Sequence, residues 1–177
     1  VNCLVVVDEA YIDFSDQASW SERLSEFENL IVLQTLSKAW GLAGLRIGIC
    51  IAHPEVIALL NKIKPPYNIN SFTQAEALRR LTERAIETRE QVNLLRQERI
   101  QLSNSLKKLK SVRKVFPSDA NFILVQIDHA TEVYHKLVSK GTVVRDRSGV
   151  VGCADCLRFT IGTPEENSLL IDQLNNL

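Results

Sequence analysis

Short, continuous apolar runs alternate with polar segments along the first third of the chain. Three such runs lie at residues 3–7, 30–35 and 46–52, and each is rich in Val, Ile or Leu. Runs that are apolar at successive positions are typical of strands buried on both faces of a parallel sheet. A segment with helical spacing, 19–28, lies between the first two runs, and another, 55–64, follows the third. We therefore predict an α/β fold with a parallel-type sheet and helices.

The middle of the chain has a different pattern. Pro65 and Pro66 open an extended segment that ends at Asn70, which favours a hinge near or shortly after it. Residues 71–109 have helical character throughout, and because this is too long for one ordinary globular helix we predict a break near 82–88. Apolar residues form one stripe before the break and one after it. The stripes are Phe72, Ala75, Leu78 and Leu81, and then Val92, Leu95, Leu102, Leu106 and Leu109.

The last third of the chain is typical of a compact α+β unit. The predicted elements are strands at 112–116, 121–127, 142–144 and 156–161, and helices at 130–140 and from 164 onward. Gly141 is suited to end the first of these helices. Thr163, Pro164 and Glu166 are the residue types of a helix N-terminus, with Thr163 as the N-cap.

Composition narrows the class of protein. The 177 residues carry 21 Lys and Arg against 21 Asp and Glu, so no excess of positive charge indicates binding to nucleic acid or to an acidic membrane. No apolar run approaches the length of a membrane-spanning helix. Four cysteines in mostly apolar contexts favour a reduced, cytoplasmic protein. Cys153 and Cys156 have the spacing of half a metal site, but no second pair or nearby His completes it, so no metal is predicted.

The start of the chain carries its own expectation. The sequence contains no methionine, and it opens at Val1 directly on an apolar strand. We therefore expect this sequence to be the C-terminal part of a longer protein.

The loop between the second and third apolar runs holds the most reactive grouping of the chain. Lys38 follows the end of a predicted strand, with Thr35 and Ser37 just before it and Arg46 just after the loop. In open α/β sheets ligands bind at the carboxyl ends of strands. A lysine amine among hydroxyls, backbone N–H groups and an arginine is suited to form an imine with an aldehyde cofactor whose phosphate the neighbours hold. The alternative is an ordinary solvated lysine in a surface loop.

Two further side chains are expected beside this loop. Asp8 ends the first predicted strand 30 positions before Lys38, and Tyr11 follows it. If the two strands are neighbours, a carboxylate, a phenol and an amine meet at one crevice, which is the set that a pyridoxal cofactor needs. Taken alone, Asp8 would be better explained as a helix N-cap and Tyr11 as a packing residue, but Lys38 downstream favours the functional interpretation.

Three segments resemble motifs of the class I/II pyridoxal-phosphate aminotransferases of fold type I. They are DEAYIDF (8–14), TLSKAWGLAGLRIG (35–48) and LRFTIGTPEEN (157–167). Two more, DANFILV (119–125) and GTVVRDRS (141–148), favour the histidinol-phosphate branch of this family. The resemblance covers the whole chain.

The resemblance implies a role for each matching residue. Lys38 is implied as the residue that binds the cofactor covalently and shuttles the proton. Asp8 pairs with the pyridine nitrogen and Tyr11 binds the ring hydroxyl. The cofactor phosphate is implied to be held by Ser37 and Arg46, with Thr35 behind them. In the substrate pocket, Arg158 grips the acidic group and Arg145 is a second arginine of the histidinol-phosphate branch.

The resemblance also implies the domain organisation. Residues 1–70 correspond to the C-terminal part of the large cofactor-binding domain, 71–88 to a helical connection and 89–177 to the small α+β domain. The family supplies a small-residue phosphate loop, a ring-stacking aromatic residue and an asparagine from a segment that this sequence does not match. We therefore expect the 177 residues to be inactive by themselves.

The implied reaction moves an amino group between L-histidinol phosphate and 2-oxoglutarate, with pyridoxal 5'-phosphate as cofactor, in a homodimer. Within the family, another aminotransferase or a decarboxylase of a phosphorylated amino compound is the alternative. From a different class, the strand LVVVDEA (4–10) also resembles the Asp-Glu strand end of P-loop ATPases and helicases. A third alternative is a non-catalytic piece that only folds or dimerises.

Overall fold

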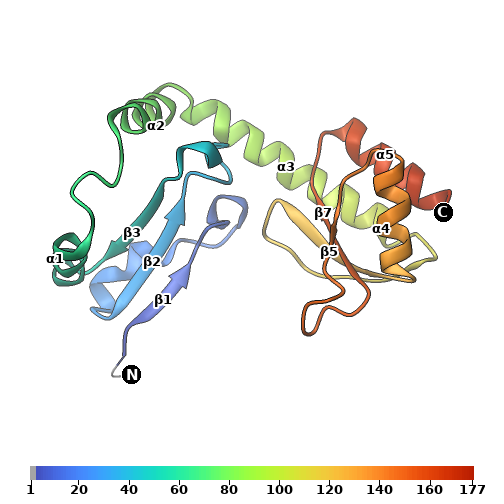
Figure 1. The fold of residues 1–177 in the computed structure, drawn as a ribbon, viewed down its shortest axis with the longest axis horizontal. Coiled ribbons are helices and arrows are strands. Elements are labelled where there is room, and N and C mark those ends of the chain that lie inside the picture. The colour runs from blue at the N-terminus through green and yellow to red at the C-terminus, as the bar shows by residue number, and fades with distance from the viewer. Residues whose placement is uncertain (1–2) are drawn as a thin grey trace. The chain divides into compact units, whose positions relative to one another are not determined.

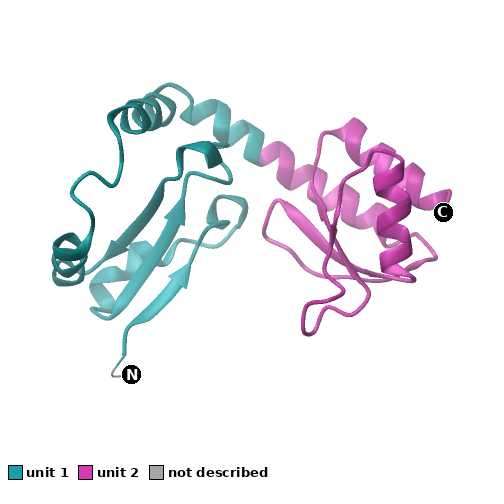
Figure 2. Ribbon diagram, in the orientation of Figure 1, with its two compact units in different colours: residues 1–92 teal, residues 93–177 magenta. Residues whose placement is uncertain are grey.

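A computed structural model describes residues 3–177 of the chain. The chain divides into two compact units, residues 1–92 and 93–177 (Figure 2). The division falls within helix α3 (Ala85–Leu106). The boundaries expected from the sequence, after residues 70 and 88, stay a prediction.

The sheet of unit 1 has three strands in the order β1 (Val5–Asp8), β2 (Leu30–Thr35) and β3 (Gly48–Ala52) (Figure 1). Strands β1 and β2 are parallel, as predicted. Strand β3 instead runs antiparallel to β2 and begins two residues later than expected. A parallel partner would need a crossover of a dozen or more residues, usually a helix. The loop 36–47 turns back directly, so antiparallel pairing is the result.

Two other expectations for unit 1 are wrong. The segment predicted as an α-helix at 19–28 forms the 3-10 helix η2 (Trp20–Glu26), with Ser19 as its N-cap. Strand β1 is not buried on both faces, since 56% of Val6 is exposed. It is the edge of its sheet, so it has a neighbour on one side only. An edge strand can be as apolar as a central one, and an apolar run cannot distinguish the two.

Three α-helices follow the sheet along the chain, α1 (Pro54–Ile63), α2 (Ser71–Glu83) and α3. The predicted break lies at Arg84, between α2 and α3. The stripe predicted for α2 does not face a core, because 87% of Phe72 is exposed and Ala77 is the residue that the helix buries. None of the helices in the described residues is long and apolar enough to cross a membrane.

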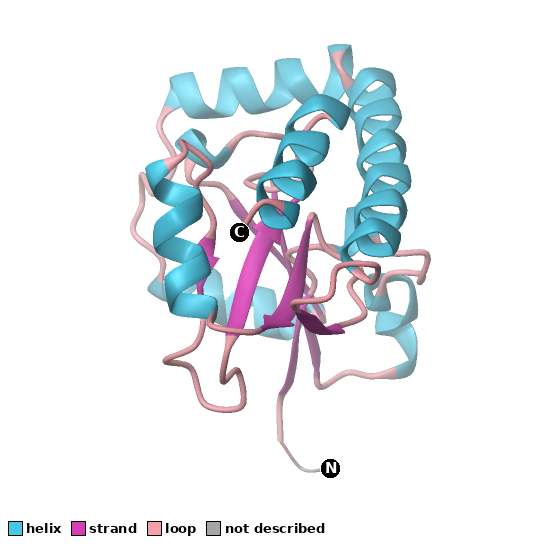
Figure 3. Cartoon of the chain, turned by 90° about the vertical axis from the view of Figure 1, so that its right-hand side faces the viewer, coloured by secondary structure: helices cyan, strands magenta, loops and turns pink. Residues whose placement is uncertain are grey.

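Unit 2 is a four-stranded antiparallel sheet covered by helices. Its strand order is β4 (Val112–Val115), β5 (Phe122–Ile127), β7 (Cys156–Thr160) and β6 (Arg145–Asp146). Helices α4 (Ala130–Ser139) and α5 (Pro164–Asn175), with the C-terminal part of α3, lie over one face, and Figure 3 looks onto this helical layer. The strand predicted at 142–144 is displaced to β6, because the chain leaves α4 through a turn at Gly141 with φ +84°.

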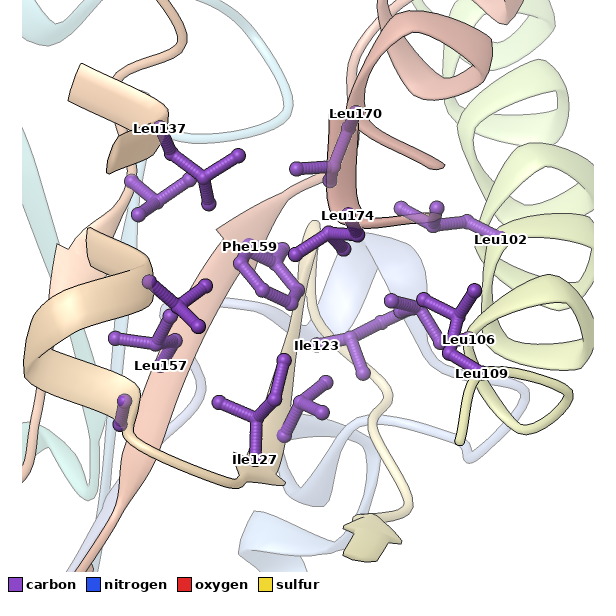
Figure 4. Close-up of a cluster of buried hydrophobic side chains, with 14 of the residues drawn as sticks. Leu102, Leu106, Leu109, Ile123, Ile127, Leu137, Leu157, Phe159, Leu170 and Leu174 are labelled. Carbon is purple, nitrogen blue, oxygen red and sulfur yellow. The ribbon is translucent and has the colours of Figure 1, made fainter. Parts of the chain in front are cut away.

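In the core of unit 2, buried and partly buried side chains alternate along strand β5. Ile123, Val125 and Ile127 of β5 are buried against the helices, whereas Phe122 and Leu124 are only partly buried on the opposite, open face. Three residues of the predicted stripe, Leu102, Leu106 and Leu109, belong to this core, and Leu95 packs against it (Figure 4). The other members of the cluster are Ala130, Val133, Leu137, Val144, Leu157, Phe159, Ile161, Leu170 and Leu174.

Polar contacts fix the start of α5 on this core. Thr163 and Glu166 form the capping box, which confirms the predicted helix start. Asn167 is buried and donates to the carboxylate of Glu98 on α3 at 2.9 Å and to the carbonyl of Gly162 at 3.1 Å. Buried polar groups need such partners, so this contact ties α5 to α3.

We predict that Leu106→Ala destabilises the protein by about 2–5 kcal/mol, because its fully buried side chain leaves a cavity in the core. The matched control is Leu94→Ala on the same helix, because Leu94 is 51% exposed. That variant is expected to lose less than about 1 kcal/mol. The free energy of unfolding in urea checks both, and equal losses would contradict the assignment of this core.

Candidate active site

The loop that carries Lys38 is fixed at both ends by apolar side chains. Leu36 and Leu42 are buried in a small cluster with Ala77 of α2. Trp40, Leu45 and Ile47 pack against that cluster. The loop is therefore held to the body of unit 1, although Lys38 itself is exposed.

Hydrogen bonds give the same loop a defined backbone. The hydroxyl of Thr35 accepts from the Ser37 N–H at 3.1 Å and donates to the Ile47 carbonyl at 3.1 Å. The Gly41 N–H donates to the Lys38 carbonyl at 3.1 Å and closes a tight turn. Gly41 has φ +65°, a conformation in which glycine avoids the strain that a side chain would bring.

The parallel pairing of β1 and β2 brings the predicted carboxylate and phenol to this loop. Asp8 is the last residue of β1 and lies opposite Leu33, five residues before Lys38. Its Oδ1 accepts from the Ala10 N–H at 3.0 Å, which shapes the turn into Tyr11. The Lys38 Nζ lies 5.3 Å from the centroid of the Tyr11 ring, within the range of a cation–π contact.

Arg46 closes the loop in an unusual backbone conformation. Its φ of 58° and ψ of 42° place it in the left-handed region, which is uncommon for a residue other than glycine. Its Nη1 donates to the Ala43 carbonyl at 3.1 Å, and within residues 3–177 the guanidinium has no carboxylate partner. Strain of this kind persists where the surroundings impose it, often at binding sites.

A carboxylate that the sequence pattern does not single out lies behind this site. Glu9 follows Asp8 and is 7% exposed. Burial would raise its pKa, but hydrogen bonds from Ser19, Gln34 and the Trp20 N–H together outweigh burial and hold the pKa of Glu9 below its usual value. In the sequence, the signal that could have pointed to Glu9 is its position as an acidic residue at the end of an apolar strand.

Unit 2 places the two predicted substrate arginines side by side. Arg145 of β6 and Arg158 of β7 are direct partners in the antiparallel register, so both side chains lie on the open face of the sheet. Neighbouring acids are engaged elsewhere: Asp146 accepts from Ser148 and Thr131, and Asp155 pairs with Arg113. Like charges directly opposite each other destabilise a sheet unless an anion joins them.

Arg158 is further oriented by an aromatic ring. Its guanidinium carbon lies 4.8 Å from the centroid of Phe122, which the sequence does not single out as a site residue. The Arg158 Nε is buried and has no hydrogen-bond partner in the described structure. A buried donor without a partner is costly, and a bound anion would satisfy it.

The structure thus groups the predicted residues in two places. Unit 1 holds Asp8, Tyr11, Thr35, Ser37, Lys38 and Arg46 around the strand ends and the loop, and unit 2 holds Arg145 and Arg158. Their individual roles stay predictions. Within residues 3–177, no cluster of three or more His, Cys, Asp or Glu side chains could hold a metal ion.

Comparison with known proteins identifies the class. The family model of aminotransferase class I and II matches residues 1–174, so the chain belongs to this family of pyridoxal-phosphate-dependent enzymes. The mixed α/β fold is that of the fold type I aminotransferases, as predicted. The P-loop ATPase or helicase alternative receives no support.

Individual relatives point to one branch of the family. The histidinol-phosphate aminotransferase of Parabacteroides distasonis is 52% identical over 174 residues, which are 98% of this chain and 50% of that protein. That of Christiangramia forsetii is 51% identical over 176 residues, 99% of this chain and 50% of the relative. The crystal structure of histidinol-phosphate aminotransferase from Sinorhizobium meliloti in complex with pyridoxal-5'-phosphate has a TM-score of 0.85 and 27% identity, covering 98% of this chain and 48% of that one. The chain spans about half the length of the curated relatives it matches.

The depressed pKa of Glu9 predicts how stability responds to acid. The folded-state pKa lies below the unfolded value of 4.5, so the stabilisation by the charged carboxylate is fully present above pH 4.5 and is lost as pH falls through the folded-state pKa. Unfolding free energies of wild type and Glu9→Gln, measured from pH 7 downward, should therefore converge only below pH 4.5. Exposed Glu28→Gln is the control, and a wild-type advantage that grows on acidification would contradict the assigned sign.

Proposed function

We propose that the intact protein is an aminotransferase that moves an amino group between L-histidinol phosphate and 2-oxoglutarate. The observation that carries this proposal is the position of the Lys38 amine. It projects from the loop after β2, 5.3 Å from the Tyr11 ring and beside the strand that ends at Asp8. Relatives with 52% and 51% sequence identity are named histidinol-phosphate aminotransferase, which supports the choice of substrate.

The residues present in unit 1 fit pyridoxal 5'-phosphate. Lys38 offers an amine that makes no ion pair among the described residues, and Arg46 offers a guanidinium free of carboxylates. Ser37 adds a hydroxyl, and Thr35 fixes the backbone beside it through its own two hydrogen bonds. These groups suit a phosphate and an aldehyde, while Asp8 suits a protonated ring nitrogen.

Each of these side chains has a distinct task in the proposed reaction. When bound, the cofactor supplies an aldehyde and an electron-withdrawing ring. Asp8 would keep the proton on the ring nitrogen, and the Tyr11 phenol would donate to the ring hydroxyl oxygen. The free Lys38 amine would accept the proton from the α-carbon of the substrate as a general base.

The paired arginines of unit 2 suit the remote anion of the two substrates. Histidinol phosphate carries a phosphate, and 2-oxoglutarate carries a second carboxylate, at a distance from the reacting group. Guanidinium groups bind both anions with two parallel hydrogen bonds, which lysine cannot reproduce. The Nε of Arg158 and the like-charge pairing with Arg145 both favour a bound anion.

We also propose that the protein works as a homodimer in the cytoplasm. Membership of the aminotransferase family supports the dimer, and four free cysteines are consistent with a reducing compartment. Another aminotransferase of the same family or a decarboxylase of a phosphorylated amino compound is the remaining alternative. Formation of glutamate without release of carbon dioxide distinguishes the proposed transferase from the decarboxylase.

We predict that borohydride reduction of the intact protein loaded with pyridoxal 5'-phosphate fixes the pyridoxyl group on Lys38, because this amine lies at the strand end beside Tyr11. Peptide mapping by mass spectrometry checks the position. Lys62, near the end of α1, is the internal control and should remain unmodified. An adduct on another lysine, with Lys38 unmodified, would contradict the proposal.

We predict that Arg158→Lys lowers kcat/KM for both substrates, since the charge survives but the guanidinium geometry does not. Arg145→Ala should lower kcat/KM for histidinol phosphate more than for 2-oxoglutarate, because the dianion gains more from a second cation. Loss of one charge-assisted contact is expected to cost about 1.5–3 kcal/mol, or roughly one to two decades in kcat/KM.

The control for both arginine variants is Arg113→Ala, which removes an exposed ion-pair partner on β4 of the same sheet. Exposed ion pairs contribute little, so its kcat/KM should stay within about twofold of wild type. If Arg145→Ala leaves histidinol phosphate turnover unchanged, the assignment of Arg145 to the substrate pocket is wrong.

A further inference from the structure

Glu9 and Asp8 are neighbours in sequence with opposite environments. Asp8 is exposed at the end of β1, whereas Glu9 is buried. The Glu9 N–H donates to the Leu33 carbonyl at 2.8 Å and so extends the parallel pairing of β1 and β2 by one step. Residue 9 is thus the last point at which the backbones of the two strands are joined before the chain turns toward Tyr11.

The Glu9 carboxylate accepts three hydrogen bonds from two other segments. Its Oε1 accepts from the Trp20 N–H at 2.7 Å. Its Oε2 accepts from the Ser19 hydroxyl at 2.6 Å and from the Gln34 side-chain amide at 2.9 Å. All three donors are neutral, and within residues 3–177 no cation pairs with Glu9. A buried carboxylate without a cation is tolerated only when its oxygens are well satisfied.

These bonds join the end of β1 to the end of β2. Gln34 lies one residue before Thr35, whose hydroxyl shapes the Lys38 loop, and four residues before Lys38 itself. Ser19 and Trp20 begin η2, the segment that returns the chain from β1 toward β2. The carboxylate therefore constrains both strands that carry the candidate catalytic groups, from the side of the sheet opposite to Asp8.

We propose that Glu9 is a positioning residue that sets the separation of Asp8 and Lys38. This inference rests on the proposed function, because it gives Glu9 a task only if Asp8 and Lys38 act on the same cofactor. Asp8 and Lys38 would then have to reach the ring nitrogen and the aldehyde of the same cofactor. Displacement of a catalytic group by about 1 Å can cost about a hundredfold in rate, so a brace between the strand ends has a direct consequence for catalysis.

The test compares substitutions in the intact protein, loaded with saturating pyridoxal 5'-phosphate and assayed well below the unfolding temperature. Glu9→Ala removes all three bonds and should lower kcat about tenfold or more, with KM for both substrates changed far less. Glu9→Gln should recover most of the lost kcat, because an amide can still accept from Trp20 while Gln34 turns its own amide to accept. Exposed Glu28→Gln is the matched control.

A second variant keeps the test decisive if Glu9→Ala does not fold. Gln34→Ala removes the side-chain contact between the two strand ends, together with the bond from Gln34 to the Ser19 hydroxyl, and leaves the bonds from Ser19 and Trp20 to Glu9 in place. It should lower kcat in the same direction by a smaller factor.

The outcomes separate the inference from the function on which it rests. Active wild-type protein with the pyridoxyl adduct on Lys38, low kcat in the Ala variants and recovery in Glu9→Gln would support the positioning role. Wild-type labelling with unchanged kcat in Glu9→Ala or Gln34→Ala, even at a lower melting temperature, would show that Glu9 acts on stability alone. Failure of the wild type to be labelled would overturn the proposed function itself.

Discussion

The parallel register between β1 and β2 is the constraint on which the candidate active site depends. Because Asp8 is opposite Leu33, the Asp8 carboxylate and the Lys38 loop both lie at the carboxyl ends of the two strands. A slip of one residue would exchange the faces of β1 and place Glu9, not Asp8, on the exposed side. Two kinds of contact oppose such a slip: the backbone bond from Glu9 to Leu33, and the buried carboxylate of Glu9 held by Ser19, Gln34 and Trp20.

In unit 2 the same two-residue periodicity separates stability from binding. Ile123, Val125, Leu157 and Phe159 face the helices and form the core, while the alternate positions of β5 and β7 face away from them. Arg158 therefore cannot turn into the core, and its position opposite Arg145 follows from the ladder. The tight helical layer on one face leaves the other face available for charged residues, which a sheet buried on both faces would exclude.

Much of this arrangement could be predicted from the sequence, and what could not has physical causes. Local signals were sufficient for the break between α2 and α3, for the capping box of α5 and for the loop that carries Lys38. The direction of β3, the 3-10 geometry of η2 and the exposure of Phe72 and Val6 depend on which segments pack together, and an apolar run contains no such information. Glu9 and Phe122 were missed because their importance lies in contacts between distant segments, with Gln34 and Arg158 respectively.

Three features that lower the stability of the chain involve positively charged residues. Arg46 adopts a left-handed backbone conformation. Among the residues that the structure describes, no acid lies between Arg145 and Arg158, and the buried Nε of Arg158 has no partner. Each feature costs free energy in the protein alone, and an anion placed against it would reduce that cost. Ligands that bind only the folded state raise its stability by mass action. A ligand that carries a phosphate should therefore stabilise this protein. These three features lie at positions that the proposed function assigns to anions, which is the pattern expected when binding, not folding, has determined those residues.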